Sequence, residues 1–231
     1  MTDAPSSEPK VLYCIRHGES MYNEWRKRSL LNFSWIYVRD PMIFDSPLTS
    51  KGQKEAQLLC QKIKREDIHT KVQVIVCSPL TRAIQTALEA FKGCEIPIVL
   101  EPLCREELGT ACDVGSSPDE LEKAFSHASE ALDFSNLALL WWLPSSKQAD
   151  SNGSIQLPKT PSEVTLIREC KKELERRIEE FVKSLMALPQ QHIAIVGHSG
   201  YFKKMLRMQR KLNNCEMHIV TLDQVILKNQ L

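Results

Sequence analysis

Two histidines and two arginines of this 231-residue sequence stand at or shortly after the ends of short apolar runs. They are Arg16, His17, Arg82 and His198. A neutral imidazole can act as a nucleophile, and a guanidinium fork makes paired, charge-assisted hydrogen bonds to phosphate oxygens. If the fold brings these four side chains together, they could bind and transfer a phosphoryl group.

Apolar runs rich in β-branched residues alternate along the chain with segments of helical periodicity. The runs predict strands at residues 11–15, 72–77, 96–100, 192–196, 219–222 and 225–227. Helices are predicted at residues 53–65, 80–91 and 201–208, and a capping box at Thr160 opens one long predicted helix that reaches Leu188. This order favours an α/β fold, a three-layer α/β/α sandwich with a mostly parallel central sheet. Because parallel strands end at one edge of the sheet, the two histidines and two arginines should face one crevice.

The sequence shows no internal repeat and no linker. We therefore expect a single domain over residues 10–231, preceded by a flexible tail at residues 1–9 and interrupted by an inserted segment at about residues 110–160. Charged side chains of the long predicted helix are most simply a solvated face; they are Lys171, Lys172, Glu173, Arg176 and Arg177. Trp141 and Trp142, in the inserted segment, are either core residues or a wall beside the substrate.

Basic and acidic side chains nearly balance, at 30 and 29, which gives a net charge of +1. No global field therefore draws the protein to nucleic acid or to a membrane, and any basic recognition surface must be local. No apolar run approaches the ~20 residues that cross a bilayer, and residues 1–9 lack the apolar stretch of a signal peptide. We expect a cytoplasmic protein with no nucleic-acid or membrane partner. Its eight scattered cysteines favour buried free thiols.

Four ordered motifs together resemble those of the histidine phosphatase superfamily, which includes the cofactor-dependent phosphoglycerate mutases. Residues 16–23 match the family's R-H-G-E-S-x-x-N signature, and residues 78–87 match its S-P-L-x-R-A-x-Q-T-A segment. His198-Ser199-Gly200 matches the late H-x-G element, and Leu48-Thr49 with Gly52 precedes the first long helix. The resemblance spans residues 11 to about 222, and it implies a phosphoglycerate mutase-like fold.

The resemblance implies that His17 attacks phosphorus and carries the phosphoryl group as a phosphohistidine, which water then hydrolyses. Its other ring nitrogen should donate to a carbonyl or similar acceptor, because the attacking nitrogen must be neutral. Arg16, Arg82 and the catalytic His198 map onto the family's phosphate pocket. Asn23 and Ser20 are either secondary substrate contacts or caps of a helix start.

The resemblance also implies a glutamate that protonates the leaving group, placed after the third strand. We choose Glu106, which follows Arg105 as in the family's common R-E pair. Many members place this acid four residues before a glycine, whereas Glu106 lies three before Gly109, so Glu107 remains an alternative. Burial beside a phosphate should raise the pKa of this acid, and we expect a bell-shaped pH dependence that needs neutral His17 and protonated Glu106.

No metal and no cofactor are expected, because the crevice offers cations and histidines rather than clustered carboxylates. Hydrolysis is favoured over mutase activity, since residues 111–156 hold only Lys123 and Lys147 as basic residues and so lack an arginine-rich clamp. The chain also resembles the plant and fungal phosphoglycerate-mutase-like phosphatases in Cys104-Arg105-Glu106, Cys112-Asp113, Trp142 and Asn214-Cys215-Glu216. The alternatives are a phosphoglycerate mutase and a non-catalytic interaction module on the same fold.

The expected partner is a small phosphorylated substrate or a phosphoprotein. Two basic clusters, residues 26–28 and residues 203–211, are either solvated helix faces or flanks of the crevice that favour highly anionic substrates. The sequence does not specify the oligomeric state.

Overall fold

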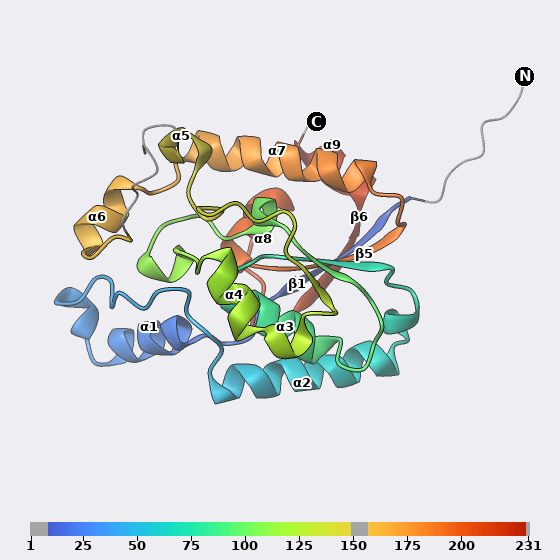
Figure 1. Ribbon diagram of the computed structural model, residues 1–231, viewed down its shortest axis with the longest axis horizontal. Helices are drawn as coiled ribbons and strands as arrows, with labels where there is room; N and C mark the ends of the chain where they lie inside the picture. Colours follow the sequence, from blue (N-terminus) through green and yellow to red (C-terminus); the bar gives the residue numbers. More distant parts are fainter. Residues whose placement is uncertain (1–8, 149–156, 230–231) are drawn as a thin grey trace, which may run out of the picture.

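The computed structural model describes residues 9–148 and 157–229, and within them a central sheet lies between two layers of helices (Figure 1). The strands are β1 Val11–Arg16, β2 Val74–Cys77, β3 Ile98–Leu100, β4 Leu132–Asp133, β5 His192–Gly197 and β6 Met217–Thr221. Their order across the sheet is β4-β3-β2-β5-β1-β6. All neighbouring strands are parallel except β1 and β6, which are antiparallel. The predicted three-layer, mostly parallel α/β fold is confirmed.

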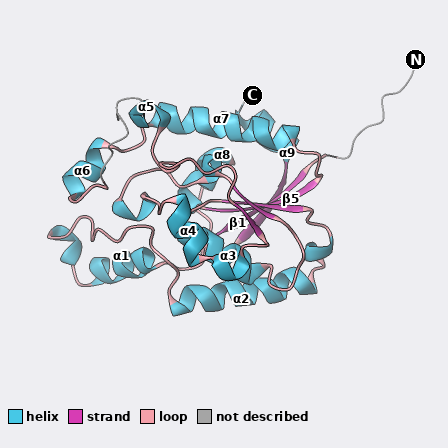
Figure 2. Cartoon of the chain, in the orientation of Figure 1, coloured by secondary structure: helices cyan, strands magenta, loops and turns pink. Residues whose placement is uncertain are grey.

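Helices cover both faces of the sheet, as Figure 2 shows by the contrast of helix and strand colours. They are α1 Met21–Leu31, α2 Ser50–Arg65, α3 Thr81–Ala90, α4 Pro118–Ala124, α5 Ser145–Gln148, α6 Pro161–Leu166, α7 Lys171–Ala187, α8 Ser199–Met205 and α9 Leu222–Asn229. Short 3₁₀ turns join them, namely η1 Ser34–Ile36, η2 Ile68–Thr70, η3 Pro102–Cys104, η4 Ala111–Asp113 and η5 Ser126–Ala128.

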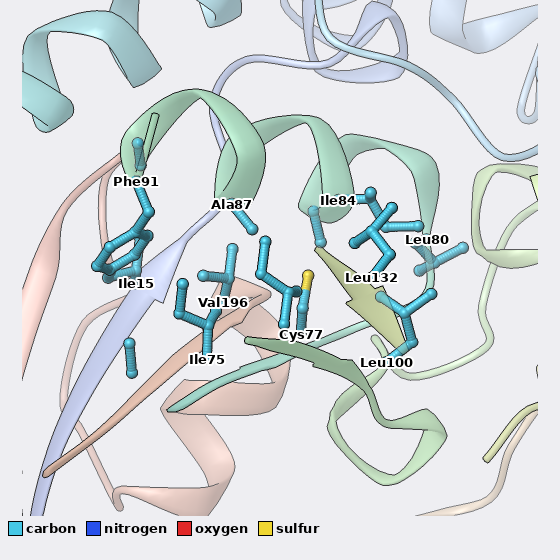
Figure 3. Packing of buried hydrophobic residues seen from close by; sticks show 14 of the residues in the cluster. Ile15, Ile75, Cys77, Leu80, Ile84, Ala87, Phe91, Leu100, Leu132 and Val196 are labelled. Carbon is cyan, nitrogen blue, oxygen red and sulfur yellow. The ribbon is translucent and has the colours of Figure 1, made fainter. Parts of the chain in front are cut away.

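Alternate residues of each central strand enter two separate cores, because successive side chains of a strand point to opposite faces. Tyr13 and Ile15 of β1 pack with α2 and α3, whereas Leu12 and Cys14 pack with α7, α8 and α9. Figure 3 shows the first core, where α3 lies over the strands through side chains that include Ile84. Burial on both faces explains why these strands read as continuous apolar runs rather than as alternating patterns.

The long helix predicted from Thr160 to Leu188 is wrong: the structure has two helices, α6 and α7, separated at residues 167–170. The helix is interrupted at Glu169, whose buried side chain lies between α7 and the segment after β3. Its carboxylate accepts hydrogen bonds from Arg177 and Arg105, and its N–H donates to the carbonyl of Leu108. The interpretation of Arg177 as part of a solvated face is wrong as well, because this guanidinium is buried.

Two further sequence interpretations need correction or addition. Residues 225–227 lie in α9 and not in a strand, with Val225 packed into the second core. The inserted segment contributes β4, a two-residue edge strand that the sequence did not indicate. The domain boundaries stay a prediction, and the predicted tail at residues 1–9 lies outside the described residues except for Pro9.

All eight cysteines are free thiols, and four of them, Cys14, Cys77, Cys104 and Cys112, are buried. The others are partly or fully exposed, so burial holds for half of them. Among the described helices, none is long and apolar enough to cross a bilayer.

Candidate active site

The polar groups that follow β1, β2 and β5 meet at one edge of the sheet, as the sequence predicted. They line a cavity of about 310 Å³ together with residues from α1 and from the segment after β3. The lining residues are Arg16, His17, Ser20, Tyr22, Asn23, Arg26, Arg82, Glu106, Glu107, Gly109, Thr110, Cys112, Asp113, Ser199, Gly200 and Lys211. His198 lies directly behind this wall, fully buried.

His17 is held in one tautomer. Its Nδ1 lies 2.6 Å from the carbonyl oxygen of Gly18, and because a carbonyl only accepts hydrogen bonds, Nδ1 carries the proton. Nε2 is then unprotonated and has a lone pair available for attack. Burial, followed by the charges of Arg82 and Arg16, lowers the pKa of His17 well below its ordinary value, so the ring stays neutral.

The loop that carries His17 is fixed by a close approach of two glycines. A Cβ atom at Gly18 would come within 2.6 Å of the carbonyl oxygen of Gly52, and a Cβ atom at Gly52 would collide with the backbone of Glu19. The N–H of Gly18 also donates to Oγ1 of Thr86 in α3 at 3.1 Å. Only residues without a side chain let the start of α2 lie this close to the loop.

Arg82 is buried on the first turn of α3 and is oriented by the segment after β3. Its Nη1 donates to the carbonyl of Cys112 at 2.6 Å, and its Nη2 pairs with Oδ1 of Asp113 at 3.0 Å. The other oxygen of Asp113 accepts from the backbone N–H and the hydroxyl of Thr110. Asp113 thus holds both Arg82 and its own loop, a role the sequence reasoning missed because it had noted this residue only as part of a resemblance.

His198 lies beside His17, with their ring centroids 5.1 Å apart. Its Nε2 is 2.8 Å from the hydroxyl of Ser78, whereas its Nδ1 is buried with no hydrogen-bond partner among the described residues. Burial and the charge of Arg82 lower its pKa well below the ordinary value. An unpaired buried nitrogen is costly unless a ligand meets it.

Arg16 and the start of α1 form another wall. Nη1 of Arg16 donates to the carbonyl of Leu212 at 2.7 Å, while its Nε is buried without a partner in the described chain. Ser20 caps α1 and exchanges hydrogen bonds with Asn23 in a capping box. Both of these residues also line the cavity, so the two alternatives for them, caps or substrate contacts, are compatible.

Glu106 and Glu107 are in different environments, although both line the cavity. Glu106 is partly exposed to the cavity, and its carboxylate accepts hydrogen bonds from the N–H groups of Gly200 and Tyr201, at the start of α8. Burial, then the charge of Asp113, raises its pKa. Glu107 is instead paired with Lys204 at 2.8 Å, and both side chains are partly exposed.

Two cations at the cavity have no ion pair or side-chain hydrogen bond within the described residues: Arg26 of α1 and Lys211. Each belongs to one of the two basic clusters whose position the sequence left open. Tyr22 and Thr110 complete the wall and had no sequence signal. Trp141 and Trp142 are buried in the first core and do not line this cavity, so their interpretation as core residues is confirmed.

No group of three or more histidine, cysteine, aspartate or glutamate side chains in residues 9–148 and 157–229 is arranged to hold a metal ion. Three carboxylates line the cavity: Asp113 pairs with Arg82, Glu107 pairs with Lys204, and Glu106 accepts hydrogen bonds from the start of α8.

Comparison with known proteins gives a consistent result. A family model, Histidine phosphatase superfamily (branch 1), matches residues 12–137. The chain is 26% identical over 227 residues to Phosphoglycerate mutase-like protein 1 of Arabidopsis thaliana, covering 85% of this chain and 71% of that protein. The fold is shared with YhfR of Bacillus stearothermophilus (TM-score 0.53, 20% identity, 90% and 89% of the two chains covered). It is also shared with the alpha-ribazole phosphatase of Shigella flexneri (TM-score 0.50, 19% identity, 90% and 89% covered).

Proposed function

The chain belongs to branch 1 of the histidine phosphatase superfamily, and from this premise we propose that it is a metal-independent phosphomonoesterase that works through a phosphohistidine on His17. The observation that carries the proposal is the Nδ1–Gly18 hydrogen bond, which leaves Nε2 of a neutral His17 free beside buried cations. A cytoplasmic location remains part of the same proposal.

In the first step Nε2 of His17 attacks phosphorus and forms a P–N bond while the P–O bond to the leaving group breaks. Glu106, which burial keeps protonated to higher pH than an ordinary glutamate, gives its proton to the leaving alkoxide. In the second step water attacks phosphorus and the P–N bond breaks. The Glu106 carboxylate takes a proton from that water, which restores both groups and releases phosphate.

Arg16, Arg82 and His198 would stabilise the phosphoryl oxygens during both steps. Asp113 fixes the guanidinium of Arg82 before substrate arrives, so little reorganisation is needed in the transition state. The Nε of Arg16 has no partner in the described chain and would donate to a phosphoryl oxygen. Nδ1 of His198 would do the same in the tautomer in which its Nε2 accepts from the Ser78 hydroxyl. Removing one such donor typically costs about a hundredfold in rate.

Hydrolysis is preferred to a mutase reaction because the segment after Glu106 contributes carboxylates, Glu107 and Asp113, and no arginine to the cavity. A mutase must hold an anionic intermediate while the phosphoryl group is returned to it. The two unpaired cations, Arg26 and Lys211, come from other parts of the chain. They favour phosphomonoesters that carry a second negative group.

The proposal is tested by phosphate release from a panel of phosphomonoesters in chelator, with an aryl phosphate and 3-phosphoglycerate included and a mutase assay with 2,3-bisphosphoglycerate alongside. We expect hydrolysis that His17→Ala abolishes and that the exposed-histidine control His127→Ala leaves intact. An acid-labile radiolabelled intermediate should form on the native chain and be absent from His17→Ala. Isomerisation without phosphate release would assign a mutase, and inactivity in both assays would favour an interaction module.

A further inference from the structure

One short segment exposes an unusual number of large apolar side chains. Seven of the nine residues from 30 to 38 are large hydrophobics that face solvent. Leu31 is 82% exposed, Phe33 65% and Tyr37 88%. The other members are Leu30, Trp35, Ile36 and Val38. We call residues 30–38 the apolar segment; it spans the end of α1 and the turn η1, at one end of the molecule in Figure 1.

The apolar segment is folded, although it buries little of its own surface. The N–H groups of Ile36 and Tyr37 donate to the carbonyls of Phe33 and Ser34, and the N–H of Ser34 donates to the side chain of Asn32. Phe33 has a φ of 60°, a left-handed conformation that is unfavourable for a bulky residue. The Phe33 side chain is itself exposed, and backbone strain of this kind occurs most often where a segment has a function.

Basic residues surround the apolar segment. Residues 26–39 hold four basic side chains, Arg26, Lys27, Arg28 and Arg39, and no acidic one. Lys27 is paired with Glu19 and Arg28 with Glu24, whereas Arg26 has no ion pair within the described residues. Arg39 has no ion pair or side-chain hydrogen bond within the described residues. Two arginines that are unpaired in the described chain, Arg26 and Arg39, therefore flank the apolar segment, although the whole chain carries a net charge of only +1.

We propose that the apolar segment docks the protein onto an anionic lipid surface, with Trp35 and its apolar neighbours in the headgroup region and the flanking cations on lipid phosphates. Aromatic and aliphatic side chains beside arginine and lysine are the composition of interfacial membrane anchors. The satisfied backbone hydrogen bonds of η1 lower the cost of leaving water. The charge of the whole chain gave no reason to expect a membrane partner. The unpaired cations beside the segment and the exposure of its apolar side chains do give such a reason.

A lipid surface fits this segment better than a second copy of the chain. A two-fold interface would place the same patch against itself and bring the unpaired Arg26 and Arg39 of each copy toward those of the other. An anionic bilayer offers the complementary charge. This attraction is local and salt-dependent, and it adds to the burial of the apolar side chains.

The test is flotation of the full chain with phosphatidylcholine vesicles, with and without phosphatidylserine. We expect binding to the phosphatidylserine vesicles that salt weakens. The double variant Trp35→Ser/Ile36→Ser should bind these vesicles with an affinity lowered by about tenfold or more. Arg39→Gln should lower the affinity by about fivefold. The matched control Leu139→Ser/Leu166→Ser removes two equally exposed leucines elsewhere and should bind as the native chain does.

Fluorescence adds a readout of orientation. Of the four tryptophans, Trp35 is half-exposed, Trp25 is partly exposed beside Tyr22, and Trp141 and Trp142 are buried. Contact of Trp35 with lipid should shift emission to shorter wavelength in the native chain and in Trp25→Phe. Trp35→Phe should keep vesicle binding and lose the shift. Three results would overturn the proposal: no binding to either vesicle, equal binding by the double variant, or a lipid-free dimer that the double variant dissociates, which would assign the segment to a second copy.

Discussion

The carboxylate of Glu106 lies directly against Gly200: the Gly200 N–H donates to Oε2 at 3.1 Å, and a Cβ atom at this glycine would come within 2.6 Å of Oε1. The start of α8 therefore holds the carboxylate of the proposed acid by hydrogen bonds and leaves just enough room for it. His198, two residues earlier, belongs to the same turn, so one short segment positions two members of the site.

Gly200→Ala should lower kcat by about a hundredfold while hardly changing stability. The new methyl group would displace only the carboxylate end of the Glu106 side chain, so the fold should change little. Proton transfer should slow strongly, because it depends on the exact position of that carboxylate. Steady-state kinetics and urea denaturation measure the two quantities. Unchanged kcat would mean that Glu106 does not need this position, and a large loss of stability would mean that the alanine disturbs the backbone instead.

The pH dependence of kcat/KM should be bell-shaped, with its maximum between the lowered pKa of His17 and the raised pKa of Glu106. His17 must be neutral, and its pKa lies well below the ordinary 6.5, so the rate falls only when the pH drops through that low value. Glu106 must be protonated, and its pKa lies above the ordinary 4.5, so the rate falls as the pH rises through that higher value. A profile that keeps increasing above neutral pH would exclude Glu106 as the acid.

Glu106→Gln should discriminate between leaving groups. An alkoxide needs a proton as it departs, so hydrolysis of alkyl phosphates should slow by about a hundredfold or more. A nitrophenolate leaves without one, so hydrolysis of nitrophenyl phosphate should slow by less than about tenfold. Glu107→Gln provides the matched control, since this neighbour is paired with Lys204 and should affect both substrates equally and weakly. The reverse pattern would assign the acid to Glu107.

Arg177 and Arg176 are adjacent on α7 and should behave oppositely on mutation. Arg177 is buried, pairs with Glu169 at 2.6 Å and donates to the carbonyls of Leu103 and Arg105. Arg177→Met should destabilise the fold by about 3–5 kcal/mol, because it leaves a buried carboxylate with one partner fewer. Arg176 is exposed and 3.6 Å from Glu180, so Arg176→Met should cost less than about 1 kcal/mol. Urea denaturation of both variants checks the contrast, and equal costs would contradict it.

Lys211→Ala should raise KM for substrates with a second negative group and leave KM for simple phosphomonoesters nearly unchanged. Lys211 lines the cavity without a partner in the described chain, so its charge is available to a ligand. The expected increase is about threefold to tenfold at low salt and smaller at high salt. An equal effect on both substrate types would place Lys211 in general phosphate binding.

The site was predictable where function depends on strand ends. His17, Arg82 and His198 follow runs that are buried on both faces, and such runs are readable as strands without knowledge of their neighbours. The choice between Glu106 and Glu107 needed the structure, because sequence spacing does not show which carboxylate accepts hydrogen bonds from the start of α8 and which one pairs with Lys204. Asp113 was missed as a site residue for the same reason: its partner, Arg82, is distant in the chain.

The errors in the fold have a similar origin. The apolar stripe of the predicted long helix runs through Ile167 and Cys170, where the helix is in fact broken. Glu169 causes the break through Arg105, which lies 64 residues earlier. Periodicity reports only on local structure, and this contact is not local. Residues 225–227 were assigned to a strand because a short apolar run does not distinguish a strand from a buried helix.

β1, the strand that directly precedes His17, is paired on both sides, in parallel with β5 and antiparallel with β6. Amide protons of such a buried strand exchange with deuterium only when the sheet itself opens. α1, in which only Ser29 is buried, should exchange much earlier. His17 is thus attached to the part of the molecule that we expect to open last. Local unfolding of α1, which forms the neighbouring wall of the cavity, can adjust this wall to a substrate without moving His17.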